Sequence, residues 1–80
     1  MKLPRDVSGV TLANALSKFG YAVSRQKGSH LRLTTQRNGQ HHVTIPKHDP
    51  IKIGTLASIV ADVARHLKLN RDELLREMFC

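Results

Sequence analysis

Hydrophobic residues recur at helical spacing near the start of this 80-residue chain. The apolar positions are Leu12, Leu16 and Phe19, with Val10 and Ala13 beside them. Ser8 is a residue type that caps the start of a helix, and Gly20 is one that ends it. The pattern therefore predicts a helix over roughly Gly9 to Phe19.

A stronger helical stripe lies in the last third of the chain. Its members are Leu56, Ile59, Val60, Val63 and Leu67. This spacing predicts a helix from Thr55 to about Leu67 that lies on a sheet. Asn70, with Glu73 three residues later, can cap a last short helix. The apolar side of that helix would be formed by Leu74, Leu75, Met78 and Phe79.

Between the helices, hydrophobic and polar residues alternate in three short runs. The runs cover Tyr21 to Gln26, His30 to Gln36 and Gln40 to Pro46. A period of two residues is typical of strands with one buried face. The order of elements thus predicts an α+β domain of two layers, with two helices on one face of a three-stranded antiparallel sheet.

The turn after the second strand determines how the second and third strands pair. A two-residue Asn38-Gly39 loop would pair Leu33 with Thr44 and mix the two faces. A three-residue loop, Arg37-Asn38-Gly39, pairs Leu33 with Val43 and leaves one face apolar. We therefore expect the three-residue loop.

The same reasoning applies to the first turn, Lys27-Gly28-Ser29. It predicts that Val23 pairs with Leu33 and that Gln26 pairs with His30. The sheet would then have an open polar face on the side away from the helices. The residues expected on this face are Ser24, Gln26, His30, Arg32, Thr34, Gln36, Gln40, His42 and Thr44.

Positive charge is concentrated in the middle of the chain. The net charge is +7, from 13 Lys and Arg against 6 Asp and Glu. Between Arg25 and Lys52 six cations face a single acid, Asp49, whereas from Ile53 onward cations and acids are equal in number. Such a patch favours a polyanionic partner, and a nucleic-acid backbone is the first candidate.

Length and composition limit the architecture. Eighty residues allow one domain, 1–80, with one small core. No apolar run is long enough for a membrane span, and Met1 to Asp6 lacks the apolar region of a secretory signal. Cys80 is the single cysteine, so no internal disulfide can form, and we expect a cytoplasmic protein.

The first turn gathers residues that can do chemistry. Gly28 permits a positive φ and the close approach of a phosphate. His30 begins the second strand, and an imidazole there can take or give a proton near neutral pH. Cations lie on both sides, at Arg25, Lys27 and Arg32. A plain hairpin with a solvated histidine has the same pattern, so these residues alone leave catalysis open.

With these residues in place, the chain resembles the HicA family of bacterial toxin–antitoxin mRNA interferases. The matching segments are Leu3-Pro4, Val7-Ser8-Gly9, Gly20-Tyr21, Arg25-Gln26-Lys27-Gly28-Ser29-His30, Val43-Thr44-Ile45-Pro46, His48, Gly54-Thr55-Leu56 and Ile59. The resemblance implies a double-stranded-RNA-binding-domain-like fold, α-β-β-β-α, here with an added short C-terminal helix. One difference is that many members read Ala-Gly-Leu after the long helix, where this chain has Arg65-His66-Leu67-Lys68-Leu69.

The resemblance also implies a function: a small ribonuclease that cleaves mRNA and is inhibited by a HicB-type antitoxin protein. The catalytic histidine of the family aligns with His30, which would deprotonate the ribose 2′-OH without a metal or other cofactor. His48 is the first candidate for the general acid and His42 is the second. Ser29 and Gly28 are auxiliary candidates. The RNA-binding candidates are Arg25, Lys27, Arg32, Lys47 and Lys52.

Other sites fit the residues less well. His41 and His42 suggest a metal, but strand neighbours point to opposite faces and no matching Cys or Asp spacing accompanies them. The acids are too scattered for a two-metal nuclease. Ser29 beside His30 lacks the orienting acid of a triad. We expect Cys80 not to be a nucleophile and His66 to be simply exposed.

Two functions therefore remain. One is an endoribonuclease toxin that uses His30. The other is a non-catalytic RNA-binding module of the same fold, which would bind duplex RNA by shape and phosphate contacts. Both need the basic patch, and only the first needs an imidazole at position 30.

Overall fold

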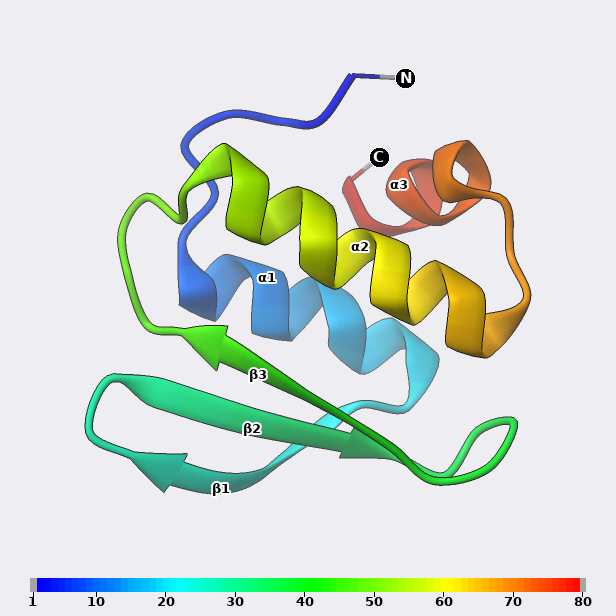
Figure 1. Ribbon diagram of the computed structural model, residues 1–80, viewed down its shortest axis with the longest axis horizontal. Coiled ribbons are helices and arrows are strands. Elements are labelled where there is room, and N and C mark those ends of the chain that lie inside the picture. The colour runs from blue at the N-terminus through cyan, green and yellow to red at the C-terminus, as the bar shows by residue number, and fades with distance from the viewer. Residues whose placement is uncertain (1, 80) are drawn as a thin grey trace.

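Three strands and three α-helices make up the computed structural model, which describes residues 2–79. In chain order the elements are α1 (Gly9–Leu16), the 3-10 helix η1 (Ser17–Phe19), β1 (Ala22–Lys27), β2 (His30–Thr35), β3 (His41–Pro46), α2 (Ile53–Leu67) and α3 (Arg71–Phe79). The strands form one antiparallel sheet in the order β1-β2-β3. Figure 1 shows α1 and α2 together on one side of this sheet. The predicted α+β fold, α-β-β-β-α with an added C-terminal helix, is confirmed.

Both predicted helical stripes are buried in the core. The side chains of Leu12, Leu16, Leu56, Val60 and Val63 are at most 1% exposed. Val10, beside the first stripe, is 48% exposed and faces away from the core. The two helices therefore use their apolar faces against each other and against β2 and β3.

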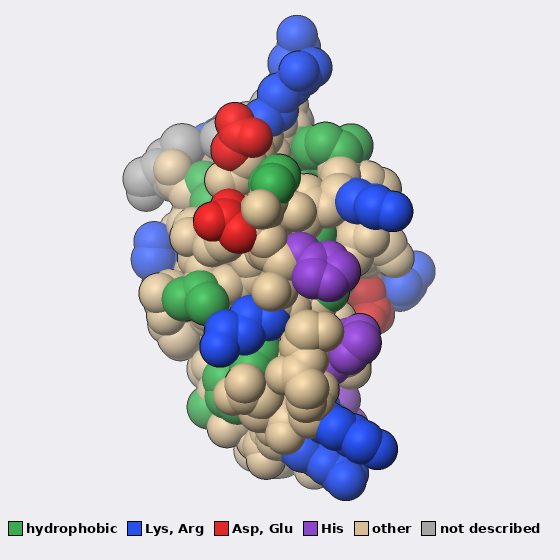
Figure 2. Space-filling model, turned by 90° about the vertical axis from the view of Figure 1, so that its left-hand side faces the viewer, with side chains coloured by type: hydrophobic (Ala, Val, Ile, Leu, Met, Phe, Trp, Pro, Cys, Tyr) green, Lys and Arg blue, Asp and Glu red, His purple; other side chains and the backbone are tan. Residues whose placement is uncertain are grey.

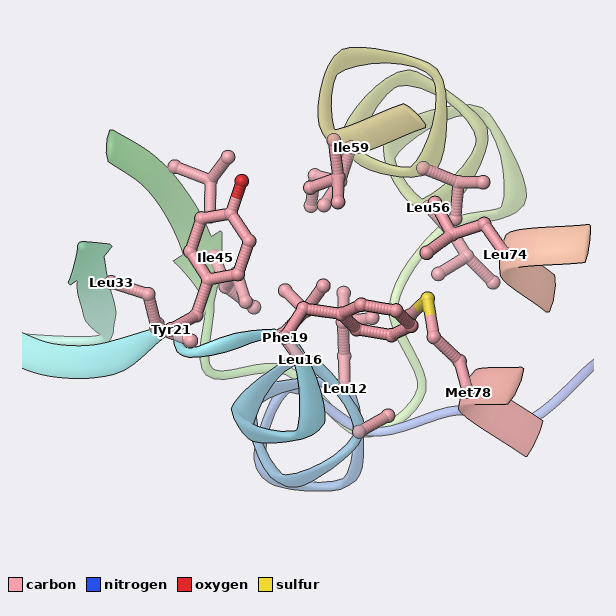
Figure 3. Packing of buried hydrophobic residues seen from close by; sticks show 14 of the residues in the cluster. Leu12, Leu16, Phe19, Tyr21, Leu33, Ile45, Leu56, Ile59, Leu74 and Met78 are labelled. Atoms are coloured by element: carbon pink, nitrogen blue, oxygen red, sulfur yellow. The ribbon is translucent and has the colours of Figure 1, made fainter. Parts of the chain in front are cut away.

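Helix α3 closes the core from the side opposite the strands. Figure 3 shows Leu74 and Met78 of α3 pointing between α1 and α2, toward Leu56 and Phe19. Leu74, Leu75 and Met78 are all buried. Burying each such side chain contributes roughly 1.5–3 kcal/mol, so this short helix is an integral part of the core.

The helix ends follow the sequence signals. The Ser8 side chain accepts a hydrogen bond of 3.0 Å from the Thr11 N–H at the start of α1. Gly20 has a φ of 84° after η1, and Asn70 Oδ1 accepts a 2.8 Å hydrogen bond from the Asp72 N–H at the start of α3. Helix α2 ends at Lys68, whose φ of 56° is left-handed without a glycine.

The pairing of β2 with β3 is the predicted one. Leu33 lies opposite Val43 and Leu31 opposite Ile45, as predicted. These four side chains are buried, and they form the sheet's contribution to the core. The last pair, however, is Thr35 with His41, so residues 36–40 connect the strands instead of the predicted three-residue loop.

The pairing of β1 with β2 differs from the prediction at one end. Val23 does pair with Leu33, but Gln26 pairs with Leu31 instead of His30. Lys27 pairs with His30, so the turn contains only Gly28 and Ser29. Gly28 has a φ of 57°, and glycine is favoured at the first position of two-residue turns with such a positive φ.

Strand β1 contains a β-bulge at Ser24, and this bulge explains why Gln26 pairs with Leu31 although Val23 pairs with Leu33 as predicted. The register shifts between Val23 and Arg25, so that β1 has one more residue than β2 over this interval. Because partners across a sheet share a face, Gln26 lies on the side of Leu31, while Arg25 and Lys27 lie on the open face. The bulge therefore turns two cations toward His30.

Strand β1 is one of the two edge strands of the sheet, and it is exposed along its whole length. Even Val23, on the side of the sheet that faces the helices, is 53% exposed. The helices therefore cover β2 and β3 but leave β1 held mainly by its pairing with β2.

No helix within residues 2–79 has the length and apolar character needed to cross a membrane.

Candidate nucleic-acid interface

The open face of the sheet carries polar and basic side chains. From the strand pairing, its members are Ser24, Arg25, Lys27, His30, Arg32, Thr34, His42 and Thr44. None of these residues is acidic, and all are exposed except Thr34, which is half-buried. The face therefore presents positive charge and hydrogen-bonding groups to solvent without an internal counter-charge.

A pocket of about 210 Å³ lies at the end of this face near the first turn. It is lined by Arg25, Lys27, His30, Arg32 and Thr44. The strand pairing explains this composition: Lys27 is opposite His30, while Arg25 and Thr44 flank Arg32 from either side. The pocket thus combines one imidazole, three cations and one hydroxyl.

The three pocket cations are not paired with acidic side chains in the part of the chain that the structure describes. Within residues 2–79, neither Arg25, Lys27 nor Arg32 forms an ion pair with an acidic side chain. Figure 2 shows Lys and Arg side chains near histidines on this end of the molecule, and no acidic side chain in the lowest part of the view, where the sheet lies. Such a pocket suits an anion with several oxygens, because each guanidinium can donate in pairs to them.

Beside the pocket, a row of hydrogen bonds crosses all three strands. Ser24 Oγ donates to the Arg32 carbonyl oxygen over 3.2 Å and lies 2.7 Å from Thr34 Oγ1. Thr34 Oγ1 in turn lies 2.7 Å from Nδ1 of His42. The row fixes the orientation of the His42 ring on the open face.

The remaining predicted site residues lie around the pocket but do not line it. Gly28 and Ser29 form the turn, and the Lys47 N–H donates to the Ser29 carbonyl oxygen. His48 is exposed in the loop after β3, where its carbonyl oxygen accepts a 2.9 Å hydrogen bond from the Gly9 N–H. Lys52 is exposed at the start of α2.

Gly9 fixes the position of the loop that carries Lys47 and His48. A Cβ at this position would meet the Pro46 carbonyl oxygen and come within 2.9 Å of Lys47 Cα. Since both contacts are with backbone, only glycine allows α1 to approach so closely. The start of α1 thus supports the end of β3 and, through it, the rim of the pocket.

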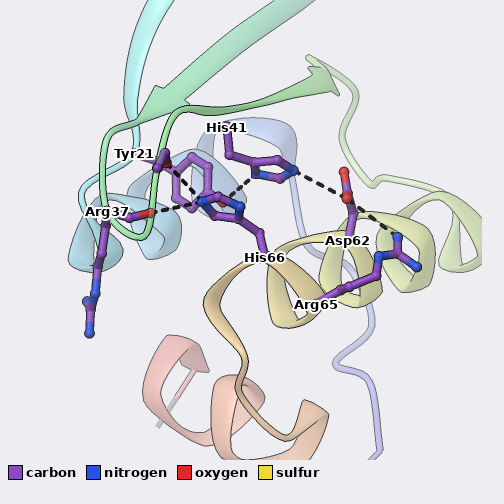
Figure 4. A network of polar contacts seen from close by, with 7 residues as sticks. Tyr21, Arg37, His41, Asp62, Arg65 and His66 are labelled. Carbon is purple, nitrogen blue, oxygen red and sulfur yellow. Dashed lines mark hydrogen bonds and ion pairs between the residues drawn. The ribbon is translucent and has the colours of Figure 1, made fainter.

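A second polar cluster, which the sequence did not reveal, lies between the sheet and α2 (Figure 4). Tyr21 Oη lies 2.7 Å from Nδ1 of His41, and Nε2 of His41 lies 3.3 Å from an Asp62 carboxylate oxygen. Burial, with a smaller contribution from the charge of Asp62, raises the pKa of Tyr21 to about 12. Because a carboxylate only accepts, Nε2 of His41 donates to Asp62, and in the neutral ring Nδ1 then accepts from the Tyr21 hydroxyl.

His66 is part of this cluster, so the prediction that it is simply exposed is wrong. Its ring stacks on that of His41, with centroids 4.3 Å apart and planes 11° from parallel. Its Nε2 lies 2.8 Å and 3.0 Å from the carbonyl oxygens of Arg37 and Gly39. Because carbonyls only accept, this nitrogen carries the proton and ties the β2–β3 turn to α2.

One signal in the sequence could have indicated this cluster. Strand alternation puts His41 on the same side as Val43, facing the helices, where a polar side chain needs a partner. Nothing in the pattern indicated that Tyr21 and Asp62 would supply it. His41 and His42 point to opposite faces of the sheet, as expected for strand neighbours. Within residues 2–79, no three His, Cys, Asp or Glu side chains come together as metal ligands. Cys80 lies outside the described residues.

The fold is that of small proteins built like double-stranded-RNA-binding domains, with a basic pocket on the open sheet face. A comparison with protein families matches residues 11–69 to a family described as HicA toxin of bacterial toxin–antitoxin. The chain belongs to the HicA toxin family, and the resemblance found in the sequence is confirmed. Membership makes it the toxin of a toxin–antitoxin system and implies an antitoxin partner. No curated protein and no solved structure matches the chain.

Proposed function

We propose that this toxin is an endoribonuclease that cleaves mRNA in the cytoplasm without a metal, with His30 as the general base. The observation that carries the proposal is the pocket itself. His30 is the one imidazole among its lining residues, and the three cations around it form no ion pair with an acidic side chain within residues 2–79. A phosphodiester seated there would have a base and a set of positive charges around one phosphorus atom.

The chemistry needs only these groups. His30 takes the proton of a ribose 2′-OH, and the 2′-oxygen attacks the neighbouring phosphorus. The bond from phosphorus to the 5′-oxygen then breaks, leaving a 2′,3′-cyclic phosphate and, once that oxygen is protonated, a 5′-hydroxyl end. Arg25, Lys27 and Arg32 stabilise the negative charge that grows on the phosphoryl oxygens. Among the described residues, the pocket lining has no carboxylate or thiolate, so its chemistry is not that of a site built to hold a divalent cation.

A second proton is needed on the departing 5′-oxygen, and His48 remains the proposed donor. It does not line the pocket, but it is exposed and lies two residues beyond Pro46, the residue that pairs with His30. Lys47 and Lys52 on the same loop would contact phosphates outside the cleaved bond, and Ser29 and Gly28 would shape the turn beside it.

The test is cleavage of an end-labelled RNA in the presence of EDTA. The wild-type protein should cut it, while His30→Ala and His30→Gln should lose cleavage and still bind the RNA. His30 is exposed, so neither change should alter the fold measured by circular dichroism. Gln26→Ala is a matched control, because Gln26 is exposed on the other side of the same sheet.

The same experiment separates this function from a non-catalytic RNA-binding module. If the wild-type protein binds RNA but never cuts it, the module is the correct function. If His30→Ala cuts as fast as the wild type, the assignment of His30 is wrong.

A further inference from the structure

The row of Ser24, Thr34 and His42 has a direction, and this direction defines what it can bind. Ser24 Oγ–H donates to the Arg32 carbonyl oxygen, which can only accept. With its single proton used there, Ser24 Oγ accepts from Thr34, and Thr34 Oγ1 then accepts from Nδ1–H of His42. In the neutral ring this leaves Nε2 as an acceptor.

Nε2 of His42 has no partner among residues 2–79, and the ring is exposed on the open face. The site is thus an oriented imidazole whose outer nitrogen accepts a hydrogen bond from a ligand. It shares its face with the pocket around His30, because Thr34 pairs with His42, Arg32 with Thr44 and His30 with Pro46. A ligand that fills the pocket can therefore continue along the sheet toward His42.

The separation from the pocket corresponds to a few nucleotides. His42 and Pro46 are four residues apart on β3, which is about 13 Å at roughly 3.3 Å per residue. A stacked strand advances about 3.4 Å per nucleotide, so this span covers at most about four nucleotides, and fewer where the strand is extended.

The two sites differ in charge, and this assigns them to different parts of a nucleotide. The pocket has three cations and suits a phosphate. The row consists of two hydroxyls and an imidazole, so it suits a neutral group with N–H donors. Unpaired nucleobases expose such donors, and single-stranded RNA commonly presents its bases to side chains.

From these observations we propose that His42, oriented by Thr34 and Ser24, binds the polar edge of one unpaired nucleobase within four nucleotides of the phosphate held at His30, and so sets the sequence preference. This inference rests on the proposed ribonuclease function for its position, but not for its binding chemistry. His42 is then a specificity-determining residue, and it is not the donor of the second proton.

The test is a scan with short single-stranded RNA oligonucleotides that the wild type cuts at one bond. Each carries one abasic nucleotide, at successive positions up to four on either side of that bond. For the wild type, one position should lower kcat/KM by about 3- to 10-fold, the range expected for loss of one neutral hydrogen bond. In His42→Ala the intact oligonucleotide should already show this loss, and the abasic change should add nothing.

Two further variants sharpen the test. Thr34→Val keeps the ring of His42 but removes the partner of Nδ1, so it should show a smaller loss at the same position. Gln26→Ala, on the other side of the sheet, should keep the wild-type profile. The proposal is overturned if the profile is the same in the wild type and in His42→Ala, or if the coupled loss follows removal of a 2′-OH instead of a base.

Binding of the same oligonucleotides to His30→Ala, measured by fluorescence anisotropy, separates the two proposals. If no RNA is cut by the wild type, the ribonuclease function fails, and the base site is judged by binding alone. A loss of affinity at one abasic position that disappears when His42→Ala is added supports it, and a uniform profile refutes it.

Discussion

At the scale of single residues, His30 and His48 divide the proposed reaction between them. His30 lines the pocket, whereas His48 lies on the loop that follows β3. If His48 protonates the departing oxygen, removing the His48 side chain slows cleavage only when that oxygen is a poor leaving group. This property distinguishes a proton donor from a residue that merely helps to bind RNA.

His48→Ala should therefore slow cleavage of normal RNA by about 10²- to 10⁴-fold, the usual contribution of one positioned acid or base. An RNA whose scissile 5′-oxygen is replaced by sulfur needs no such proton, so the variant should cut it nearly as fast as the wild type does. The measurement is the single-turnover rate on both substrates. An equal loss on the two would remove His48 from the chemistry.

The absorbance of Tyr21 reports directly on the cluster between the sheet and α2, because Tyr21 is the single tyrosine in the chain. Its absorbance as tyrosinate should appear with a midpoint near pH 12 in the folded protein, against about 10 when the chain is unfolded.

The sign of the effect on stability follows from this difference. A pKa raised by folding means that the native state holds the proton more tightly, so the contribution is complete below pH 10 and is lost as pH rises from 10 to 12. The free energy of unfolding should fall over this range more steeply for the wild type than for Tyr21→Phe. The measurement is urea denaturation at several pH values. If the free energy of unfolding fell equally with pH in the two proteins, the raised pKa of Tyr21 would be contradicted.

At the scale of elements, the end of α2 is a helix terminus formed without a glycine. Lys68 takes the left-handed conformation that glycine adopts most easily. A side chain there is strained by about 1–2 kcal/mol, while glycine is about 0.5–1 kcal/mol more costly to order.

Lys68→Gly should therefore stabilise the protein by about 0.5–1 kcal/mol, seen as a higher midpoint in urea denaturation. Lys68→Ala is the matched control, since it removes the charge but keeps the strain, and it should give no such gain. A loss of stability in the glycine variant would mean that the Lys68 side chain makes a compensating contribution.

The elements that were predicted correctly are those whose signal is periodic. The stripe from Leu56 to Leu67 and the alternation through Leu31 and Leu33 determine which faces are buried, and the core follows from them. The bulge at Ser24 has no such signal, because it is a local change in backbone pairing and leaves the hydrophobic pattern intact. It moved Gln26 off the open face and brought Arg25 and Lys27 onto it. His30 and the cations were candidates from the sequence, and they remain candidates; their grouping in one pocket required the structure.

At the scale of the whole molecule, the charge distribution constrains the antitoxin. The open face carries Arg25, Lys27 and Arg32 without an acid, and Lys47 lies beside the first turn. A protein that covers this face needs carboxylates opposite these cations, since opposite potentials speed association and exclude wrong partners. A HicB-type antitoxin of this chemistry would bury His30 and compete with RNA.

The expected outcome is that the toxin–antitoxin complex loses RNA binding, and that Lys27→Glu with Lys47→Glu weakens binding of the antitoxin more than 10-fold, or about 1.4 kcal/mol. The measurement is a competition assay with labelled RNA and the antitoxin encoded beside this chain. If the complex binds RNA as tightly as the free toxin does, the antitoxin must act from another surface.

Because β1 is exposed, the pocket is open to loss by local unfolding of this strand. Two of the three pocket cations stand on β1, which the helices do not cover, whereas the other edge strand, β3, buries Val43 and Ile45 against them. Segments of this kind open far more often than the core, by local unfolding that leaves the rest of the molecule intact. Amide protons of Ala22–Lys27 should therefore exchange with deuterium faster than those of β3, and equal protection would contradict this. The toxin would then have a state in which it is folded but lacks the proposed anion site, so its activity and its global stability would vary independently.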